Sequence, residues 1–156
     1  MIIRPVQEVD IPLLAEFWYD QMALLSQKQS FIGLMPDAIE QWRNYAYEIM
    51  QDEMINFLAI ESEHEILGSI IGRIEDNQAG LLPQKYGVID QLILDLHSPH
   101  KRKSAVNSLL DALKSRFRQQ NISHIIVRVP IYSLAEQGFW RGLGATQLNN
   151  SFWMEI

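Results

Sequence analysis

The sequence predicts an α/β domain, and three features of its 156 residues carry that prediction. Segments with strand-like and helical periodicity alternate along the chain in the order β-α-α-β-β-β-α-β-α-β. The apolar run at 86–96 lies between turn signals, which indicates a strand buried on both faces. No internal repeat, low-complexity segment or linker interrupts the pattern, so we expect a single domain over residues 1–156.

In the first third of the chain the pattern predicts one strand and two helices. Residues 1–6 are a short β-type run, and Asp10 offers an N-cap for a helix over 11–25. A second helix is expected behind Pro36, because apolar residues recur there at helical spacing. These residues are Ala38, Ile39, Trp42, Tyr45, Ala46 and Ile49.

The middle of the chain predicts a hairpin, a buried strand and an amphipathic helix. The β-rich runs 55–62 and 65–76 are separated by a polar turn around Glu63 and His64, as in an antiparallel hairpin. After the buried strand we expect a helix that opens on Ser104. Its apolar face is formed by Val106, Leu109, Leu110, Leu113 and Phe117.

The last quarter of the chain completes the alternation. A strand is expected over 123–130, where Pro130 stops it because proline cannot donate to the ladder. A short helix follows over 132–144, with Gly144 as its C-terminal signal. Residues 146–156 are expected to close the sheet as a final strand or hairpin.

Composition excludes several classes of function. The chain has no cysteine, which excludes disulfides, thiolate metal sites and cysteine nucleophiles and is typical of a reducing compartment. Nothing near the N-terminus resembles an export signal and no apolar run is long enough to span a membrane, so we expect a cytoplasmic protein. The net charge of −6 disfavours nucleic acid as a partner. The four histidines are dispersed, so no metal site is expected.

A basic segment, "HKRK" at His100–Lys103, stands directly before the predicted helix start at Ser104. Cations at a helix N-terminus are electrostatically unfavourable unless an anion offsets them. The helix dipole, its free N–H groups and these cations together would suit a phosphate. The alternative is a solvated run of charge with no ligand.

Asp90 introduces a carboxylate into an otherwise apolar row. Counting by two along the buried strand places it on one face with Val88, Leu92 and Leu94. Burial among them would raise the pKa of Asp90 towards the range of a general base. Alternatively, Asp90 accepts structural hydrogen bonds, or the twist of the strand turns it to solvent.

Four segments of the second half resemble motifs of the GNAT superfamily of acyl-CoA-dependent N-acetyltransferases. They are "IDQLILD" at Ile89–Asp95, "KRKSAV" at Lys101–Val106, the pair Leu109 and Leu110, and "FWRGLGA" at Phe139–Ala145. The order of elements along the whole chain is similar too. The resemblance implies a mixed central sheet with helices on both faces, and transfer of an acetyl group from acetyl-CoA to a primary amine.

The resemblance also implies roles for particular residues. Asp90 would be the catalytic base that deprotonates the acceptor amine. Coenzyme A would be bound by Leu92, Leu94, Lys101, Arg102, Lys103, Ser104, Ala105, Val106 and Trp140. Two departures stand out: Ser104 and Val106 occupy positions where the family has glycines, and Trp140 replaces a tyrosine that commonly protonates the departing thiolate.

The first third of the chain and the C-terminal segment bear on the acceptor and the partners of the protein. The first third is rich in aromatic residues, and the resemblance implies that this region walls the acceptor pocket, where Asp20, Asp37 and Glu40 would suit an amine. A small-molecule or peptide amine would serve equally well. The family relation also implies a homodimer through the C-terminal segment 149–156. The alternative function is a GNAT-fold module that binds an acyl-CoA or another ligand without catalysis.

Overall fold

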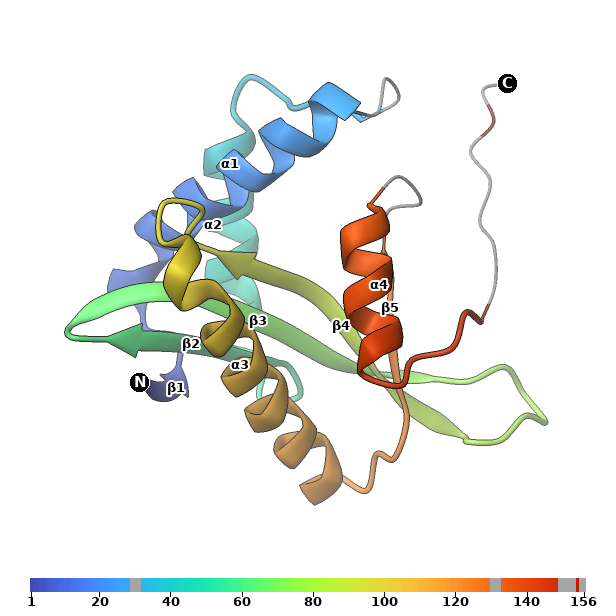
Figure 1. The fold of residues 1–156 in the computed structure, drawn as a ribbon. Coiled ribbons are helices and arrows are strands. Elements are labelled where there is room, and N and C mark those ends of the chain that lie inside the picture. The colour runs from blue at the N-terminus through green and yellow to red at the C-terminus, as the bar shows by residue number, and fades with distance from the viewer. Residues whose placement is uncertain (29–31, 130–132, 149–153, 155–156) are drawn as a thin grey trace.

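The computed structural model describes residues 1–28, 32–129, 133–148 and 154 (Figure 1). The strands are β1 (Ile2–Pro5), β2 (Asn56–Ser62), β3 (Glu65–Asp76), β4 (Lys85–Leu94) and β5 (Ile125–Val127). The helices are the short 3-10 helix η1 (Glu8–Asp10), α1 (Ile11–Lys28), α2 (Ala38–Ile49), α3 (Pro99–Gln119) and α4 (Leu134–Gly142). Among the described residues, no helix is both long and apolar enough to cross a membrane.

The sheet is mixed, as the resemblance implied. Its five strands lie in the order β1-β2-β3-β4-β5. The first four are antiparallel, and β5 pairs with β4 in parallel after the crossover through α3. The turn between β2 and β3 has its two central residues, Glu63 and His64, at φ 57° and 69°. Two positive φ angles fit the two-residue turns whose twist matches that of a hairpin.

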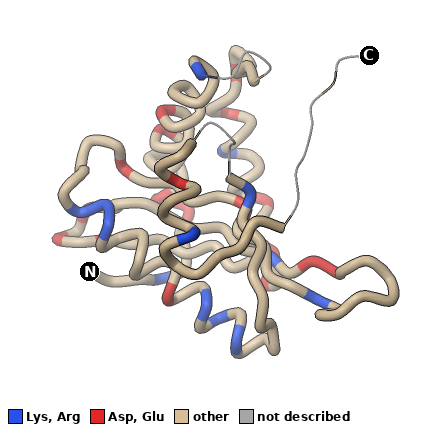
Figure 2. The backbone as a smooth tube through the Cα atoms, turned by 45° about the vertical axis from the view of Figure 1, so that its right-hand side comes forward, with Lys and Arg blue, Asp and Glu red and all other residues tan. Residues whose placement is uncertain are grey.

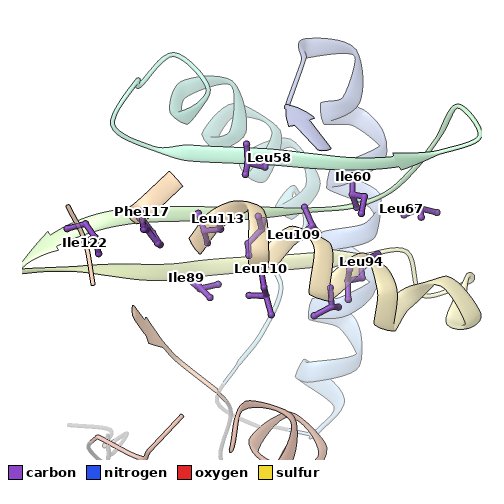
Figure 3. Close-up of a cluster of buried hydrophobic side chains, with 13 residues drawn as sticks. Leu58, Ile60, Leu67, Ile89, Leu94, Leu109, Leu110, Leu113, Phe117 and Ile122 are labelled. Carbon is purple, nitrogen blue, oxygen red and sulfur yellow. The ribbon is translucent and has the colours of Figure 1, made fainter. Parts of the chain in front are cut away.

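Helix α3 covers one face of the sheet (Figure 1). Its apolar side chains Leu109, Leu110, Leu113 and Phe117 are almost completely buried against side chains of β2, β3 and β4 (Figure 3). This is the amphipathic face expected from the sequence, and Val106 belongs to it.

Two glycines let α3 approach the sheet closely. A Cβ built on Gly72 of β3 would lie 2.6 Å from Leu113 Cδ1. One built on Gly87 of β4 would lie 2.6 Å from Phe117 Cε2. Because both neighbouring side chains are fully buried, neither has room to move aside.

Helices α1 and α2 cover the opposite face, so the expectation of helices on both faces is confirmed. Their core is aromatic: the rings of Trp18 and Trp42 stack at 5.9 Å between centroids, and Trp42 meets Phe57 of β2 edge to face at 6.5 Å. Of the aromatic residues in the first third of the chain, Phe17, Trp18, Trp42, Tyr45 and Tyr47 belong to this core, and Phe31 lies outside the described residues.

Asp10 does not cap α1 in the expected way. It lies inside η1, and its Oδ2 accepts the backbone N–H of Gln7 at 2.8 Å in a capping box. The same carboxylate accepts two hydrogen bonds from the Arg4 guanidinium, at 2.7 and 2.9 Å. Burial disfavours the charge of Asp10, but the bonds from Arg4 and Gln7 outweigh it and hold its pKa below the ordinary value.

Helix α3 begins earlier than expected, at Pro99 rather than at Ser104. Proline is well tolerated in the first turn of a helix, where its missing N–H has no partner to lose. The expected position of His100–Lys103 before the helix is therefore wrong, because these residues lie within its first turns. Ser104 is exposed, and its hydroxyl contacts Met1 Sδ at 3.6 Å instead of capping the helix.

The C-terminal quarter follows the expected order in shortened form. Strand β5 has three residues, and α4 ends where Gly144 adopts φ 90°, which confirms this glycine as the stop signal. The expected final strand falls on residues 146–156, of which 146–148 have no regular structure and 149–153, 155 and 156 lie outside the described residues.

Candidate active site

A β-bulge at Asp90 divides strand β4. In the register with β3, Gln91 is opposite Ile71 and Ile89 is opposite Gly72, so Asp90 has no residue opposite it. The extra residue changes the alternation of side chains between the two faces of the sheet.

The expected row of Val88, Asp90, Leu92 and Leu94 is therefore wrong. Leu92 and Leu94 pack into the core beneath α3, whereas Asp90 lies on the face of α1 and α2. Period-two counting fails here because a bulge cannot be read from the pattern of apolar residues alone.

Strands β4 and β5 pair only at their first residues, Gly87–Ile89 with Ile125–Val127. Past this point the β5 side of β4 has no strand partner among the described residues. The Asp95 N–H donates to Leu67 O of β3. Because backbone groups alternate along a strand, those of Leu92 and Leu94 point to the opposite, open side of β4. A bulge followed by an unpaired strand edge offers backbone donors and acceptors to an extended ligand.

Asp90 lies in a network of charges rather than among apolar side chains. Arg73 Nε is 2.8 Å from Asp90 Oδ2, and Arg73 NH2 is 3.1 Å from Glu75 Oε1. The Asp90 side chain is 17% exposed. The expected apolar surroundings of Asp90 are therefore wrong, because its carboxylate pairs with the guanidinium of Arg73.

Two residues of α2 complete this face of the site. Trp42 Nε1 donates a 2.9 Å hydrogen bond to Gln91 Oε1, next to the bulge. Burial raises the pKa of the Tyr45 hydroxyl, and the negative charge of Asp90 raises it further. Tyr45 therefore keeps its proton at neutral pH and can act only as a hydroxyl donor or acceptor there.

The basic residues of α3 form two groups, one in its first turns and one towards its end (Figure 2). In the first group, Lys101 Nζ lies 3.3 Å from Glu63 Oε2 and Arg102 NH2 donates to Leu96 O at 3.1 Å, while Lys103 is exposed. Ala105 and Val106 are 1% and 7% exposed, with their side chains in the core. Both lie inside the helix rather than in a phosphate-binding turn.

Asp95 lies between the end of β4 and the start of α3. Burial opposes its charge, but hydrogen bonds from Ser98 and from the His97 N–H, and the charges of His97 and Arg102, hold its pKa below the ordinary value. Its carboxylate is thus satisfied by local hydrogen bonds.

Trp140 lies on α4 and packs on the edge of the α3 core. Its ring meets that of Phe139 edge to face at 5.2 Å between centroids. An indole N–H is not an acid that can protonate a thiolate at neutral pH.

Two surface pockets lie away from the bulge. One, of about 460 Å³, lies between α1 and α2 and includes Tyr19, Asp37, Glu40 and Tyr47 in its lining, but not Asp90. The other, of about 510 Å³, includes His64, Asp95 and Ser98. Within the described ranges, no group of three or more histidine, aspartate or glutamate side chains could hold a metal ion.

No family model matches the chain, and no curated protein matches it significantly in sequence. Solved structures match along its whole length. An aminoglycoside 6'-N-acetyltransferase from Acinetobacter haemolyticus superposes with a TM-score of 0.74 at 14% identity, covering 100% of this chain and 98% of that one. A predicted acetyltransferase from Clostridium acetobutylicum, solved with acetyl-CoA, gives 0.74 at 16% identity over 99% and 94% of the two chains. A GCN5-related N-acetyltransferase from Ralstonia eutropha gives 0.71 at 15% identity over 99% and 97%.

The chain has the GNAT fold. Within this fold, Asp90 lies on the face of β4 opposite to that of Leu92 and Leu94, and the strand leads into the basic start of α3. The structure does not place Ala105 or Val106 in an open turn.

Sequence reasoning missed two residues of the candidate site, Arg73 on β3 and Gln21 on α1. Arg73 lies opposite Val88 in the antiparallel register, so pairing the two strands by hand could have found it. Gln21 and its partner Leu92 on β4 are 71 residues apart in the sequence, so no local pattern indicates their contact.

Proposed function

We propose that this chain is an N-acetyltransferase that transfers the acetyl group of acetyl-CoA to a primary amine. The observation that carries the proposal is the open edge of β4 after the bulge at Asp90, which leads directly to the N-terminus of α3. The GNAT fold supports it, as do two structurally similar proteins, one named an aminoglycoside 6'-N-acetyltransferase and one solved with acetyl-CoA.

In this proposal the two ends of coenzyme A use two parts of the site. The backbone of Leu92 and Leu94 would pair with the extended arm, and the start of α3 would face the pyrophosphate. Helix N–H groups and the positive end of the helix dipole favour an anion, and Lys101, Arg102 and Lys103 add charge in the same turns. The contact is therefore proposed one turn earlier than the sequence motif suggested, at 98–103, with Ser104 at its margin.

The chemistry needs one proton to leave the amine and one to reach the thiol. The amine nitrogen attacks the thioester carbon, an amide bond forms, and the carbon–sulfur bond breaks. We propose that Asp90 accepts the proton of the amine, directly or through water, while Arg73 keeps the carboxylate in place. A thiol has a pKa near 8.5, so the thiolate is a moderately good leaving group and can take its proton from water.

The test is an assay of acetyl transfer with a panel of primary amines. The panel contains an aminoglycoside, a polyamine, an amino acid and a peptide with a free N-terminus, and a tertiary amine serves as control. We expect amine-dependent release of free thiol, together with an acceptor whose mass has grown by one acetyl group. Coenzyme A binding without acetylation of any amine would contradict the catalytic proposal.

The second candidate is an acyl-CoA binding module without catalysis. Two observations favour it: Arg73 neutralises Asp90, and Trp140 cannot supply a proton. The homodimer, the cytoplasmic location and the single domain over residues 1–156 remain predictions. The segment expected at the dimer contact, 149–156, lies almost entirely outside the described residues.

A further inference from the structure

Gln21 of α1 bonds to the open edge of β4 with both ends of its side-chain amide. Its Nε2 donates to Leu92 O at 3.4 Å, and its Oε1 accepts the Leu94 N–H at 3.3 Å. The side chain is half-buried. Both contacts are long for hydrogen bonds of this type.

The two backbone groups are those that a neighbouring strand would use. In a ladder, the C=O of one residue and the N–H of the residue two further along point to the same side. Leu92 and Leu94 form such a pair on the side of β4 away from β3. A primary amide that donates to one and accepts from the other has the hydrogen-bonding pattern of a peptide unit.

We propose that the Gln21 amide occupies the place of a ligand amide and is displaced when an extended, amide-containing chain binds to β4. This inference rests on the proposed function, in which that chain is the pantetheine arm of coenzyme A. The arm carries amide groups with the same donor and acceptor as the Gln21 side chain. An unsatisfied backbone pair at a half-buried edge is costly, so Gln21 satisfies it in the free protein.

Through Gln21, helix α1 therefore controls how tightly the ligand binds to β4. Binding must break two internal hydrogen bonds before the ligand makes its own, so part of the interaction energy is lost. Because the bonds are long and the side chain has three rotatable bonds, displacement requires only a change of rotamer. Gln21 thus sets the affinity for the arm without taking part in the chemistry.

The test compares the native protein with Gln21→Ala and Gln21→Leu. The leucine variant keeps the volume but cannot hydrogen-bond. Gln27→Ala, an exposed glutamine on the same helix, is the matched control. Calorimetry with coenzyme A measures affinity, and amide hydrogen exchange measures protection of the Leu94 N–H in the free and bound protein.

We expect both Gln21 variants to bind coenzyme A about 3- to 10-fold more tightly than the native protein, since two modest hydrogen bonds no longer compete. Without ligand, the Leu94 N–H should exchange faster in these variants, and coenzyme A should restore its protection. Gln27→Ala should match the native protein in both measurements.

Equal or weaker binding by both variants would overturn the inference alone, because Gln21 would then be neutral or a direct ligand contact. Binding that leaves the Leu94 N–H unprotected would overturn it too, since the arm would lie elsewhere. Absence of coenzyme A binding to every variant would overturn the proposed function and this inference with it.

Discussion

Arg73 holds the carboxylate of Asp90 at the bulge of β4, with Arg73 Nε 2.8 Å from Asp90 Oδ2. The same guanidinium reaches Glu75, 3.1 Å away, so one cation serves two carboxylates. Only Asp90 lies at the bulge, beside the open edge of β4. The two carboxylates on Arg73 therefore differ in position, and this difference makes Glu75 a suitable control for Asp90.

Asp90→Asn should lower acetyl transfer about 10²- to 10⁴-fold, the usual effect of removing a general base. Coenzyme A affinity should stay nearly unchanged, because the amide replaces the carboxylate without changing its size. Steady-state kinetics and calorimetry check both parts. Glu75→Gln is the matched control, because it removes the other carboxylate on Arg73 and should change turnover much less. Full activity of Asp90→Asn on the true acceptor would remove Asp90 from the mechanism.

Trp140→Tyr should raise acetyl transfer by about tenfold near neutral pH, because a phenol can protonate the leaving thiolate and an indole cannot. Phe139→Tyr adds the same phenol at the neighbouring position and should give no such increase. Initial rates with saturating acetyl-CoA make the comparison. A Trp140→Tyr variant that is inactive on every amine but still binds coenzyme A would favour the non-catalytic module.

Asp10→Asn should reduce the free energy of unfolding by about 2 kcal/mol at pH 7, because it breaks a buried pair with Arg4. The pKa of Asp10 is lowered on folding, so its contribution is present above the unfolded value of about 3.9 and lost as pH falls through the folded value. The stabilities of the two proteins should therefore converge below about pH 4. Urea unfolding from pH 7 to pH 2 measures this, with Glu8→Gln on the same 3-10 helix as control. A constant difference across that range would contradict the assignment.

Gly87→Ala should destabilise the protein by about 1–3 kcal/mol, the usual cost of overpacking, because its new Cβ would meet the buried ring of Phe117 at 2.6 Å. Gly138→Ala is the opposite case. Nothing lies within 4 Å of a Cβ there, and the residue is inside α4, so we expect a gain of about 0.5–1 kcal/mol. Thermal unfolding of both variants makes the comparison. Equal melting temperatures would mean that α3 does not pack on the sheet as closely as the structure shows.

The sequence predicted the order of elements well because periodicity reports burial directly. The apolar face of α3 and the hairpin turn at Glu63 and His64 both follow from local pattern. The start of α3 could not be found in the same way. Pro99 and Ser104 are both acceptable near a helix N-terminus, so the local sequence does not decide between them.

The candidate site was less predictable, for a physical reason. A bulge inserts one residue without changing composition, so counting by two placed Asp90 with Leu92 and Leu94 although the sheet separates them. Arg73 and Gln21 reach the site from other elements, and their contacts depend on tertiary structure alone.

The most direct test of the account is a calorimetric titration of the native protein with coenzyme A and with pantetheine, which lacks the phosphates. In the proposed site the arm lies on β4 and the pyrophosphate at the start of α3, where charge-assisted hydrogen bonds form. We predict that coenzyme A binds at least about tenfold more tightly than pantetheine, and that added salt reduces this difference. Equal affinity for the two ligands, or no binding of either, would contradict the proposed site.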